Sequence, residues 1–445
     1  MDGNASHETI YQNRNEPQYP CLLTNSPCYT QSMEPGHAIA IFGREPTLSA
    51  WELFRLTHST TVPVLTRELA VLPLPPELTA AQLQRRSGGL VKVGIVKGDV
   101  ADLSALEHIL GKQWPDLVPA GSTARIAFGG SAYDAGVPPS RTFRRDVGSM
   151  LQRIKREMVG TDRAARIVVS KEQTLSAAAL TQGKILERGF ELLVLCRPDG
   201  LTWGITVTMQ DISAYGSRDV GRPSRDTKSG MLPPKVAQVM VNLSQVSSDE
   251  KLLDPFCGSG TILQEAALIG VQHLQGSDIS AKAVADTEEN FAWLTQHLPE
   301  TRDAVCAVRL LDAAQLEPTY GRSSVDVVVT EPYLGPPQRG TPQGRVLLPL
   351  VSALSRQYTT WLQSIAHVLK PNGRAVMVWP FFRVEPQGYF LQLQKAAHDA
   401  GFTIVVPPKQ LLDASWFRST PRGSVLYSRP DQIVGREIVV LQKRA

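Results

Sequence analysis

The chain has 445 residues, which exceeds the usual size of one hydrophobic core and predicts two or three domains. Apolar residues make up 42% and charged residues 20%, proportions that exclude a chain too polar to collapse. The formal net charge of +4 permits binding to nucleic acid but is too small to argue for it, so the positions of the basic residues matter more.

The amino-terminal residues and the cysteines bear on the cellular compartment. Residues 1–35 are rich in Asn, Pro, Ser, Thr and Gln without a regular period, so we expect a flexible leader there. This leader lacks the basic start and apolar core of a signal peptide, and no long apolar run occurs, so we expect neither secretion nor membrane insertion. Five scattered cysteines without a CxxC pair favour a reducing cytoplasm, and eight histidines without HxH or HxxxH spacing give no reason to expect a metal.

Regular patterns begin at His37. The runs HAIAIFG, VKVGIV and ARIAFG are typical of strands, and LSAWELFRL, LSALEHILG and SMLQRIKREM have the spacing of amphipathic helices. We therefore predict an α+β region over residues 36–170 and interpret residues 171–214 as a linker region.

A basic stretch lies inside this first region. Residues 140–157 contain six basic and two acidic side chains. Such an excess predicts contact with a phosphate backbone, whereas a solvated helix face explains the same charges equally well. The candidate RNA contacts are Arg141, Arg144, Arg145 and Lys155.

The composition shifts to Gly, Pro and charged residues around Gly216, which predicts a domain junction near residues 205–230. Beyond it, β-branched runs alternate with helical stretches, in LLDPF, TILQEAALIG, LQGSDI, AKAVADTEENFAWL, VDVVVTEP and RAVMVWPF. This alternation predicts a mostly parallel, doubly wound α/β sheet over residues 215–445.

The strongest signal for a ligand is the stretch LLDPFCGSGTILQEAALIG, in which a strand ends at Asp254 and a glycine-rich turn leads into a helix. Gly258 and Gly260 lack the Cβ that would keep a ligand from the backbone, and free N–H groups at the helix start can bind a carboxylate. A plain tight turn is the alternative, because a lone glycine-rich turn is a weak signal. Asp278 and Asp312 follow the next two strand-like runs, and three acids at successive strand ends indicate a nucleoside-binding cleft.

The turn is not the GxGxxG of nicotinamide enzymes, because no glycine follows at the third position after Gly260. DPFCGSGT instead resembles the cofactor motif of Rossmann-like methyltransferases that modify exocyclic amino groups of nucleic-acid bases. The resemblance implies S-adenosylmethionine as the cofactor, with Asp278 on its ribose and Asp312 on its adenine. The implied cofactor-binding set is Asp254, Phe256, Gly258, Ser259, Gly260, Thr261, Asp278, Ile279, Asp312 and Ala313.

A second motif, VDVVVTEPYLGPP, ends a predicted strand with Thr330, Glu331, Pro332 and Tyr333, our candidate catalytic residues. In the amino-methyltransferase class this strand end reads Asp or Asn, Pro, Pro and an aromatic residue. There the polar side chain and a backbone carbonyl accept hydrogen bonds from the target amine, and the ring stacks on the extruded base. When TEPY is aligned with this motif without a gap, Thr330 takes the acidic position. When one residue is deleted from the alignment, Glu331 takes it. We expect Glu331, the better acceptor, to bind the amine; an inactive or altered enzyme is the competing interpretation.

The segment before the cofactor motif carries five basic against two acidic residues between Arg218 and Lys235. It resembles the same segment in tRNA guanine N2-methyltransferases that carry a THUMP domain and act on guanosine 10. Their THUMP region resembles IAFGGSAYD together with the basic helix and ARIVV. Their linker resembles ILERGFELLV, and their final hairpin resembles GSVLYSRPDQIVGREIVVL. The resemblance therefore covers about residues 36–445. Further candidate RNA contacts are Arg218, Arg222, Arg225 and Lys228.

The resemblance implies methyl transfer to the N2 of guanine in a flipped base of tRNA, with the THUMP domain on the acceptor end. tRNA is then the expected partner, no membrane is involved, and a small helper subunit stays open. A DNA amino-methyltransferase acting on adenine N6 or cytosine N4 is the nearest alternative, although the amino-terminal domain favours RNA. A catalytically degenerate RNA-binding protein that kept the fold is another. A small-molecule methyltransferase would leave the basic segment and the first domain without a task.

Overall fold

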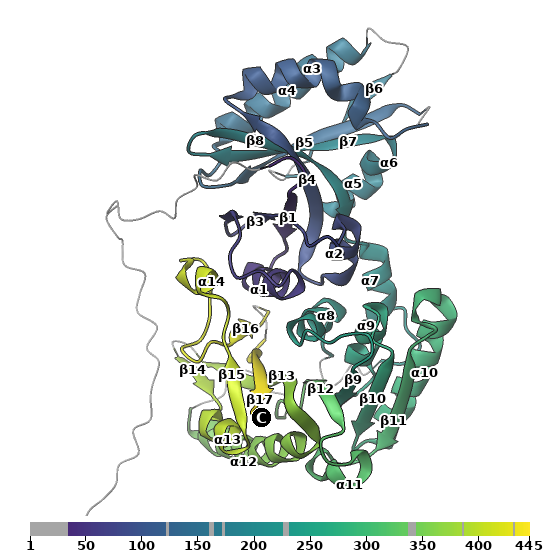
Figure 1. Ribbon diagram of the computed structural model, residues 1–445, viewed down its shortest axis with the longest axis vertical. Helices are drawn as coiled ribbons and strands as arrows, with labels where there is room; N and C mark the ends of the chain where they lie inside the picture. The colour runs from purple at the N-terminus through teal and green to yellow at the C-terminus, as the bar shows by residue number, and fades with distance from the viewer. Residues whose placement is uncertain are drawn as a thin grey trace, which may run out of the picture.

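The structure is a computed structural model of the chain. It describes residues 34–121, 124–159, 164–170, 174–225, 231–336, 344–384, 387–429 and 432–445, so most of the expected leader lies outside the described residues. In the part of the chain that it describes, an eight-stranded sheet and a nine-stranded sheet form the upper and lower halves of the molecule in Figure 1.

The first sheet consists of β1 (Ala38–Phe42), β2 (Val64–Leu65), β3 (Leu69–Leu72), β4 (Leu90–Val100), β5 (Ile126–Asp134), β6 (Ala165–Ile167), β7 (Gly189–Arg197) and β8 (Gly200–Met209). Their order across the sheet is β2-β3-β1-β4-β8-β7-β5-β6. β5 runs parallel to both β6 and β7, and the other neighbouring pairs are antiparallel.

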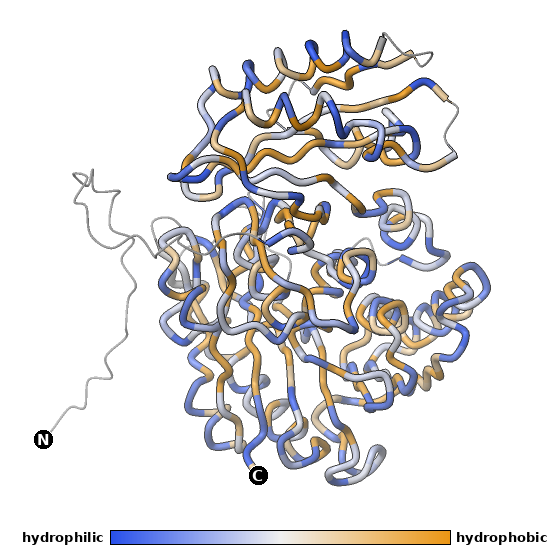
Figure 2. Tube along the Cα trace, turned by 45° about the horizontal axis from the view of Figure 1, so that its top comes forward, coloured by the Kyte–Doolittle hydropathy of each residue, from blue (hydrophilic) through white to orange (hydrophobic). Residues whose placement is uncertain are grey.

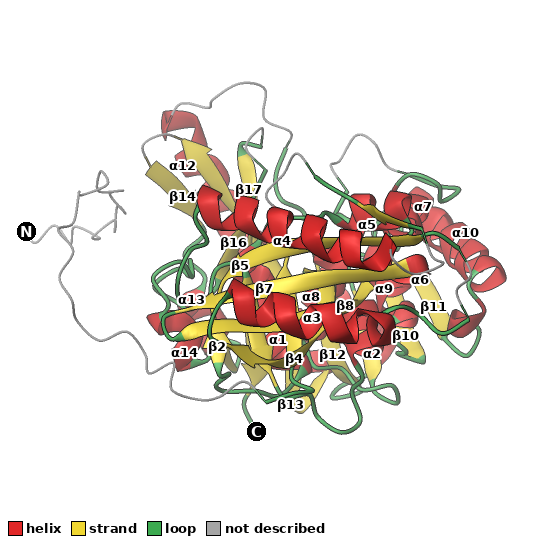
Figure 3. Cartoon of the chain, turned by 90° about the horizontal axis from the view of Figure 1, so that it is seen from above, coloured by secondary structure: helices red, strands yellow, loops and turns green. Residues whose placement is uncertain are grey.

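Two long helices, α3 (Leu103–Leu117) and α4 (Arg141–Val159), cover the face of the first sheet that points away from the second half (Figures 1 and 3). The buried side chains of α4 recur every three or four residues, as in an amphipathic helix that packs one face on a sheet. They meet the buried side chains of α3 and of β5, β7 and β8 in one apolar cluster. The other helices of this half are α1 (Pro46–Leu56), α2 (Ala80–Arg86), α5 (Ala177–Gly183) and α6 (Ile185–Arg188).

Residues 171–214 are not a linker, contrary to our expectation. β7 and β8 form a hairpin inside the first sheet, where β8 pairs with β4 and β7 pairs with β5. Residues 189–196 of β7 are buried without alternation, because a strand covered on both faces needs apolar residues on both. The chain reaches the second half through α7 (Ile212–Asp219).

The second sheet consists of β9 (Lys251–Asp254), β10 (His273–Asp278), β11 (Val305–Leu310), β12 (Val325–Thr330), β13 (Leu369–Val384), β14 (Gln387–Phe390), β15 (Phe402–Val405), β16 (Val425–Tyr427) and β17 (Val434–Lys443). Its main order is β11-β10-β9-β12-β13-β17-β15, with β14 paired to β13 and β16 paired to β17. The five strands from β11 to β13 are parallel, and β17 returns antiparallel between β13 and β15. Apolar residues follow these strands through the middle of the half (Figure 2).

Helices pack on both faces of the second sheet, as the doubly wound class requires. One apolar core lies under α8 (Pro234–Leu243), α9 (Thr261–Leu268) and α10 (Ala281–His297), and the other under α12 (Gly344–Val368) and α13 (Gln394–Asp399). The predicted α/β Rossmann-like fold is therefore confirmed. Shorter elements are η1 (Pro299–Thr301), η2 (Ala313–Gln315), α11 (Glu317–Tyr320) and α14 (Lys409–Asp413).

The two halves share a buried contact between α1 and α8. The carboxylate of Glu52 is fully buried and accepts hydrogen bonds from the backbone N–H groups of Gly88 and Gly89 and from the side-chain amide of Asn242. Arg55 Nε donates to the Leu243 carbonyl at 3.0 Å. Because a buried carboxylate is costly unless it is hydrogen-bonded, these bonds hold one arrangement of the two halves.

Candidate active site

The strand order β11-β10-β9-β12-β13 has its topological switch point between β9 and β12. Ligands of doubly wound sheets bind at such a point, beside the carboxyl ends of the strands. Here Asp254 ends β9 and Thr330 ends β12. The Thr330 hydroxyl donates a 2.7 Å hydrogen bond to Asp254 Oδ1, and the Phe256 N–H donates to the same oxygen at 3.2 Å. Burial raises the pKa of Asp254 to about 7, despite these two bonds. The two motifs predicted from the sequence therefore touch.

The glycine-rich turn follows β9 and is fixed by two polar side chains of α10. Gly258 and Gly260 have φ values of +54° and +83°, a region that favours glycine. A Cβ on Gly260 would lie 2.9 Å from Thr287 Cγ2, whereas a Cβ on Gly258 would meet no atom within 4 Å. Thr287 Oγ1 donates to the Gly258 carbonyl at 2.8 Å, and Asn290 Nδ2 donates to the Ser259 carbonyl at 2.8 Å. The turn thus has one packed side and one open side.

Thr287 and Asn290 were not among the residues that we singled out from the sequence. Both side chains are fully buried on the face of α10 that packs on the glycine-rich turn. Both could have been noticed in the sequence as polar residues on the apolar face of a predicted helix. Such a residue is expected to be buried, and a buried polar group needs a hydrogen-bond partner. The partner itself, a backbone carbonyl of the turn, has no sequence pattern.

The other two predicted acids lie along the same edge of the sheet. Asp278, the last residue of β10, accepts hydrogen bonds from the Gly258 N–H at 3.0 Å and from the Ser280 N–H at 2.9 Å. Asp312 follows β11, is exposed, and accepts from the Ala314 N–H at 2.9 Å. Next to these acids, Ile279 is 73% exposed and Ala313 is buried. The structure therefore places the predicted cofactor-binding residues at the ends of three neighbouring strands.

Aromatic residues of α12 support both motifs. The ring of Phe256 meets the ring of Trp361 edge to face, with 4.7 Å between centroids. The buried Tyr358 hydroxyl donates to the Tyr333 carbonyl at 3.2 Å. The Tyr333 side chain is 52% exposed and so remains open to a stacking partner, while Pro332 is buried. Neither Tyr358 nor Trp361 was predicted; their signal is only the i, i+3 spacing that places them on one side of α12.

Glu331 is paired with an arginine of β17. The Nε and Nη2 atoms of Arg436 donate to the two carboxylate oxygens, with 3.0 Å between Nη2 and Oε1. The Arg436 side chain is 3% exposed and the Glu331 side chain is 15% exposed. Glu331 therefore presents a fixed carboxylate beside the end of β12. The sequence drew no attention to Arg436 beyond its place in the final REIVVL stretch.

Two of the predicted RNA contacts are wrong. Arg218 forms a buried ion pair with Glu265 of α9, with 2.7 Å between Nε and Oε1, and its side chain is 9% exposed. Arg222 is also buried; its Nη1 donates to Thr261 Oγ1 at 2.8 Å and its Nη2 to Ser259 Oγ at 3.1 Å. A buried guanidinium cannot reach a phosphate backbone, and a count of local charges does not show which way each side chain points. Arg222 instead contacts the glycine-rich turn.

The remaining basic candidates lie in different places. Arg225 is exposed near the turn, and Lys228 lies outside the described residues. On α4, Arg141 and Arg145 are exposed, whereas Arg144 and Lys155 are half-buried. Because α4 lies on the far face of the first sheet (Figure 1), its basic side chains form a surface separate from the glycine-rich turn. Their contact with RNA stays a prediction.

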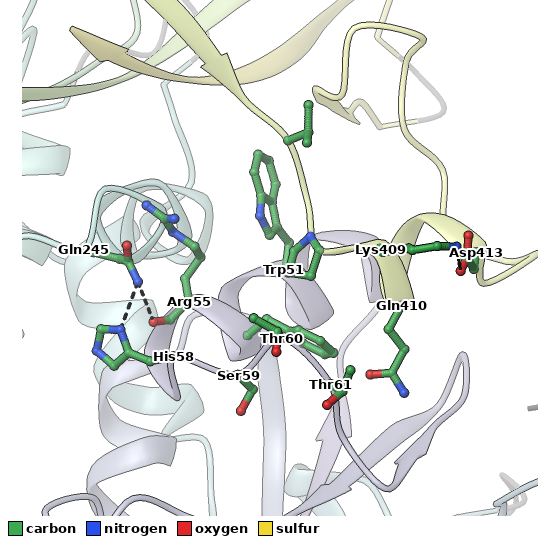
Figure 4. A pocket seen from close by; sticks show the side chains of 13 residues that line it. Trp51, Arg55, His58, Ser59, Thr60, Thr61, Gln245, Lys409, Gln410 and Asp413 are labelled. Atoms are coloured by element: carbon green, nitrogen blue, oxygen red, sulfur yellow. Dashed lines mark hydrogen bonds and ion pairs between the residues drawn. The ribbon is translucent and has the colours of Figure 1, made fainter. Parts of the chain in front are cut away.

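A cavity of about 620 Å³ lies at the seam between the two halves (Figure 4). Its lining includes Trp51, Arg55 and His58 from the first half and Gln245 and Gln410 from the second. It contains none of the predicted cofactor-binding or catalytic residues. This cavity is therefore distinct from the site at the carboxyl ends of β9 and β12.

Among the described residues, no group of three or more His, Cys, Asp and Glu side chains gathers in a way that would hold a metal ion. Within the same residues, no helix is long and apolar enough to cross a membrane.

Comparison with known proteins agrees with the second half of the fold. Residues 222–381 match the family model described as "RMKL-like, methyltransferase domain". The crystal structure of TrmN from Thermus thermophilus superposes with a TM-score of 0.50 at 20% identity, covering 92% of this chain and 99% of that one. Fold, strand order and family match define the second half as a Rossmann-like methyltransferase domain, a class whose cofactor is S-adenosylmethionine.

The chain also shows sequence similarity to tRNA-modifying enzymes. A tRNA (guanine(10)-N2)-dimethyltransferase of Methanothermobacter thermautotrophicus is 41% identical over 106 residues, which are 24% of this chain and 28% of that protein. One of Methanocaldococcus jannaschii is 32% identical over 154 residues, 34% of this chain and 38% of that protein. This similarity agrees with the resemblance noted in the sequence, and the match spans less than two fifths of the length of these two relatives.

Proposed function

We propose that the chain transfers a methyl group from S-adenosylmethionine to the exocyclic N2 of a guanosine in tRNA. The observation that carries this proposal is the hydrogen bond between Thr330 and Asp254, because it joins the cofactor motif to the strand end that would bind the amine. The two curated relatives support the choice of guanine in tRNA, since both are named for that reaction.

The residues around the glycine-rich turn fit the methionine part of this cofactor. Helix α9 begins directly after Gly260 without a side-chain cap, so its first N–H groups can bind a carboxylate. The Arg222 guanidinium lies beside them, and its buried Nε has no hydrogen-bond partner among the described residues. Burial lowers the pKa of Arg222, even though the charges of Asp219, Glu265 and Asp286 act in the opposite sense. A buried cation that donates only to neutral atoms is stabilised by an anion, and the cofactor carries a carboxylate.

The other cofactor groups have matching side chains. Asp278 would accept hydrogen bonds from the ribose hydroxyls, while the Gly258 N–H that it already binds keeps its carboxylate against the turn. Asp312 would accept from the adenine amino group, and the exposed Ile279 would cover the adenine face. When bound, the cofactor supplies an electrophilic methyl group on a sulfonium centre.

The catalytic part is assigned to the end of β12. Glu331 would accept a hydrogen bond from the guanine N2, together with the backbone carbonyl near Pro332, and so hold the amine with its lone pair towards the methyl group. Tyr333 would stack on the extruded base, since its ring is half exposed beside this carboxylate. No covalent intermediate is needed for this transfer.

The first half and the exposed basic residues are assigned to tRNA binding. Arg141 and Arg145 on α4, with Arg225 near the turn, would contact phosphates of the tRNA. The first half of the molecule, with the β7–β8 hairpin included, would act as the THUMP-containing module. We place the activity in the cytoplasm, because the cysteines that the structure describes are free thiols.

The proposal is tested by incubating the purified chain with tritiated S-adenosylmethionine and either total tRNA or duplex DNA. We expect label in tRNA and none above background in DNA. Label in DNA alone would overturn the proposal in favour of a DNA amino-methyltransferase. Binding of tRNA without label in either substrate would favour a protein that has kept the fold without the reaction.

A further inference from the structure

Glu331 and Arg436 meet across an intervening strand. Glu331 follows the end of β12, Arg436 lies on β17, and β13 runs between them. The backbone register pairs Arg436 with Pro380 of β13 on one side and with Tyr427 of β16 on the other. The Arg436 side chain is 3% exposed, and its Nε and Nη2 atoms face the Glu331 carboxylate.

Two parallel hydrogen bonds fix a carboxylate more completely than one. A guanidinium presents its N–H groups in a rigid fork, so the bonds from Nε and Nη2 set both the position and the plane of the Glu331 carboxylate. Each carboxylate oxygen has two acceptor sites, and the fork occupies one on each oxygen. The carboxylate can therefore accept from an amine while it is held by Arg436.

The length of the side chain at position 331 gives a reason for this arrangement. Glutamate has one more rotatable bond than the aspartate expected at this position of the amino-methyltransferase class, so a free glutamate carboxylate would sample more positions. A loss of alignment of about 1 Å can cost roughly a hundredfold in rate. A glutamate at this strand end therefore needs an external constraint, and Arg436 supplies one.

We propose that Arg436 is a positioning residue that holds the Glu331 carboxylate for the target amine. This inference rests on the proposed function of the site. Arg436 does not touch the substrate in this scheme, and it acts through Glu331 alone.

The same strand offers a matched control. Arg422 forms a second buried fork with Glu437, with 2.6 Å between Nε and Oε1 and 2.9 Å between Nη2 and Oε2. The exposed fractions of these side chains are 9% and 0%. Glu437 follows Arg436 directly, and successive residues of a strand point to opposite faces, so this pair lies away from Glu331. Arg422→Lys should reproduce the structural cost of losing a buried fork without disturbing the proposed site.

The experiment compares Arg436→Lys with Arg422→Lys by single-turnover methylation of tRNA, the KM for tRNA, titration with S-adenosylhomocysteine, and Tm. We expect Arg436→Lys to lower the rate of methyl transfer by about tenfold to a hundredfold, with the KM and the affinity for S-adenosylhomocysteine unchanged within about twofold. Arg422→Lys should keep the wild-type rate. Glu331→Asp, which leaves Arg436 intact but withdraws the carboxylate by one methylene, should also slow the reaction.

A third arm tests whether Arg436 acts through Glu331. In a Glu331→Ala background, Arg436→Lys should cause no further loss of rate. Three results would overturn the inference: an equal additional loss in that background, a wild-type rate in Arg436→Lys, or full activity in Glu331→Asp. The proposed function would still stand in each case, provided that the wild-type chain methylates tRNA. Absence of tRNA methylation by the wild-type chain would overturn both.

Discussion

The hydroxyl of Thr330 and the carboxylate of Asp254 form a buried hydrogen bond of 2.7 Å between two residues that are 76 positions apart in the sequence. Thr330 is fully buried and Asp254 is 1% exposed, so the bond lies in a region of weak screening. It connects the strand end that precedes the glycine-rich turn with the strand end that precedes Glu331. In the proposed function, the sheet would therefore set the distance between the cofactor and the target amine.

The first prediction concerns the pH dependence of stability. The unfolded chain releases the Asp254 proton near the ordinary pKa of 3.8, whereas burial raises the folded-state pKa to about 7. The folded state then binds the proton more tightly, so this residue lowers the free energy of unfolding as pH rises from about 4 to about 7, by at most roughly 4 kcal/mol. Asp254→Asn removes the ionisation, and chemical denaturation should show a smaller loss of stability over this range. Identical pH slopes for the variant and the wild type would contradict this assignment.

A second prediction tests the amine acceptor. Glu331→Ala should lower the rate of methyl transfer by about 10² to 10³, because the carboxylate interacts with an amine that must be aligned in the transition state. Glu331→Gln should lose less, since the amide keeps one acceptor oxygen. Glu250→Gln, which removes an acid paired with Arg374 at the opposite edge of the sheet, should keep the wild-type rate. Unimpaired turnover in both Glu331 variants would remove this residue from the mechanism.

The third prediction concerns Arg222. Arg222→Met should weaken binding of S-adenosylhomocysteine by about tenfold to a hundredfold in calorimetric titration, because a charged hydrogen bond to a carboxylate contributes roughly 1.5–3 kcal/mol. Arg302→Met, a change at an exposed position beside the amino end of β11, serves as the control and should leave the affinity unchanged. Equal affinities for both variants would show that the ligand carboxylate does not reach Arg222.

A fourth prediction tests the exposed face of α4. Replacing Arg141 and Arg145 together by Glu should raise the KM for tRNA and reduce its dependence on salt concentration, as expected when phosphate contacts are lost. The rate at saturating tRNA and the affinity for S-adenosylhomocysteine should stay at wild-type values. Wild-type KM and salt dependence in this variant would favour the solvated-face interpretation of the helix.

The elements of the second half follow from local sequence patterns. The runs that end at Asp254 and Thr330, and the helical stretches between them, carry enough periodicity to predict the doubly wound sheet, because side-chain periodicity reports local conformation. The glycine-rich turn and the acid at the end of β10 were predictable for the same reason. The β7–β8 hairpin was misinterpreted as a linker, because ILERGFELLV was compared with the linker of the family and because β7, which is buried on both faces, lacks the alternation that marks a half-buried strand.

The partners of the site residues were not predictable in this way. Arg436 lies 105 residues after Glu331, and only the return of β17 beside β13 brings them together. Arg218 and Arg222 were interpreted as surface charges, because a local count of basic residues does not show where each side chain points. In the structure Arg218 is buried against Glu265, and Arg222 is buried against the glycine-rich turn. Such pairings depend on tertiary contacts, and a single sequence carries no local signal for them.

The most direct test of methylation at guanine N2 compares modified nucleosides in tRNA from cells with and without the gene. Digestion to nucleosides followed by mass spectrometry measures N2-methylguanosine and N2,N2-dimethylguanosine separately. The account predicts that one or both are present in the parent cells, are lost when the gene is removed, and return with the wild-type gene but not with Glu331→Ala. Unchanged amounts of both nucleosides in cells that lack the gene would contradict it.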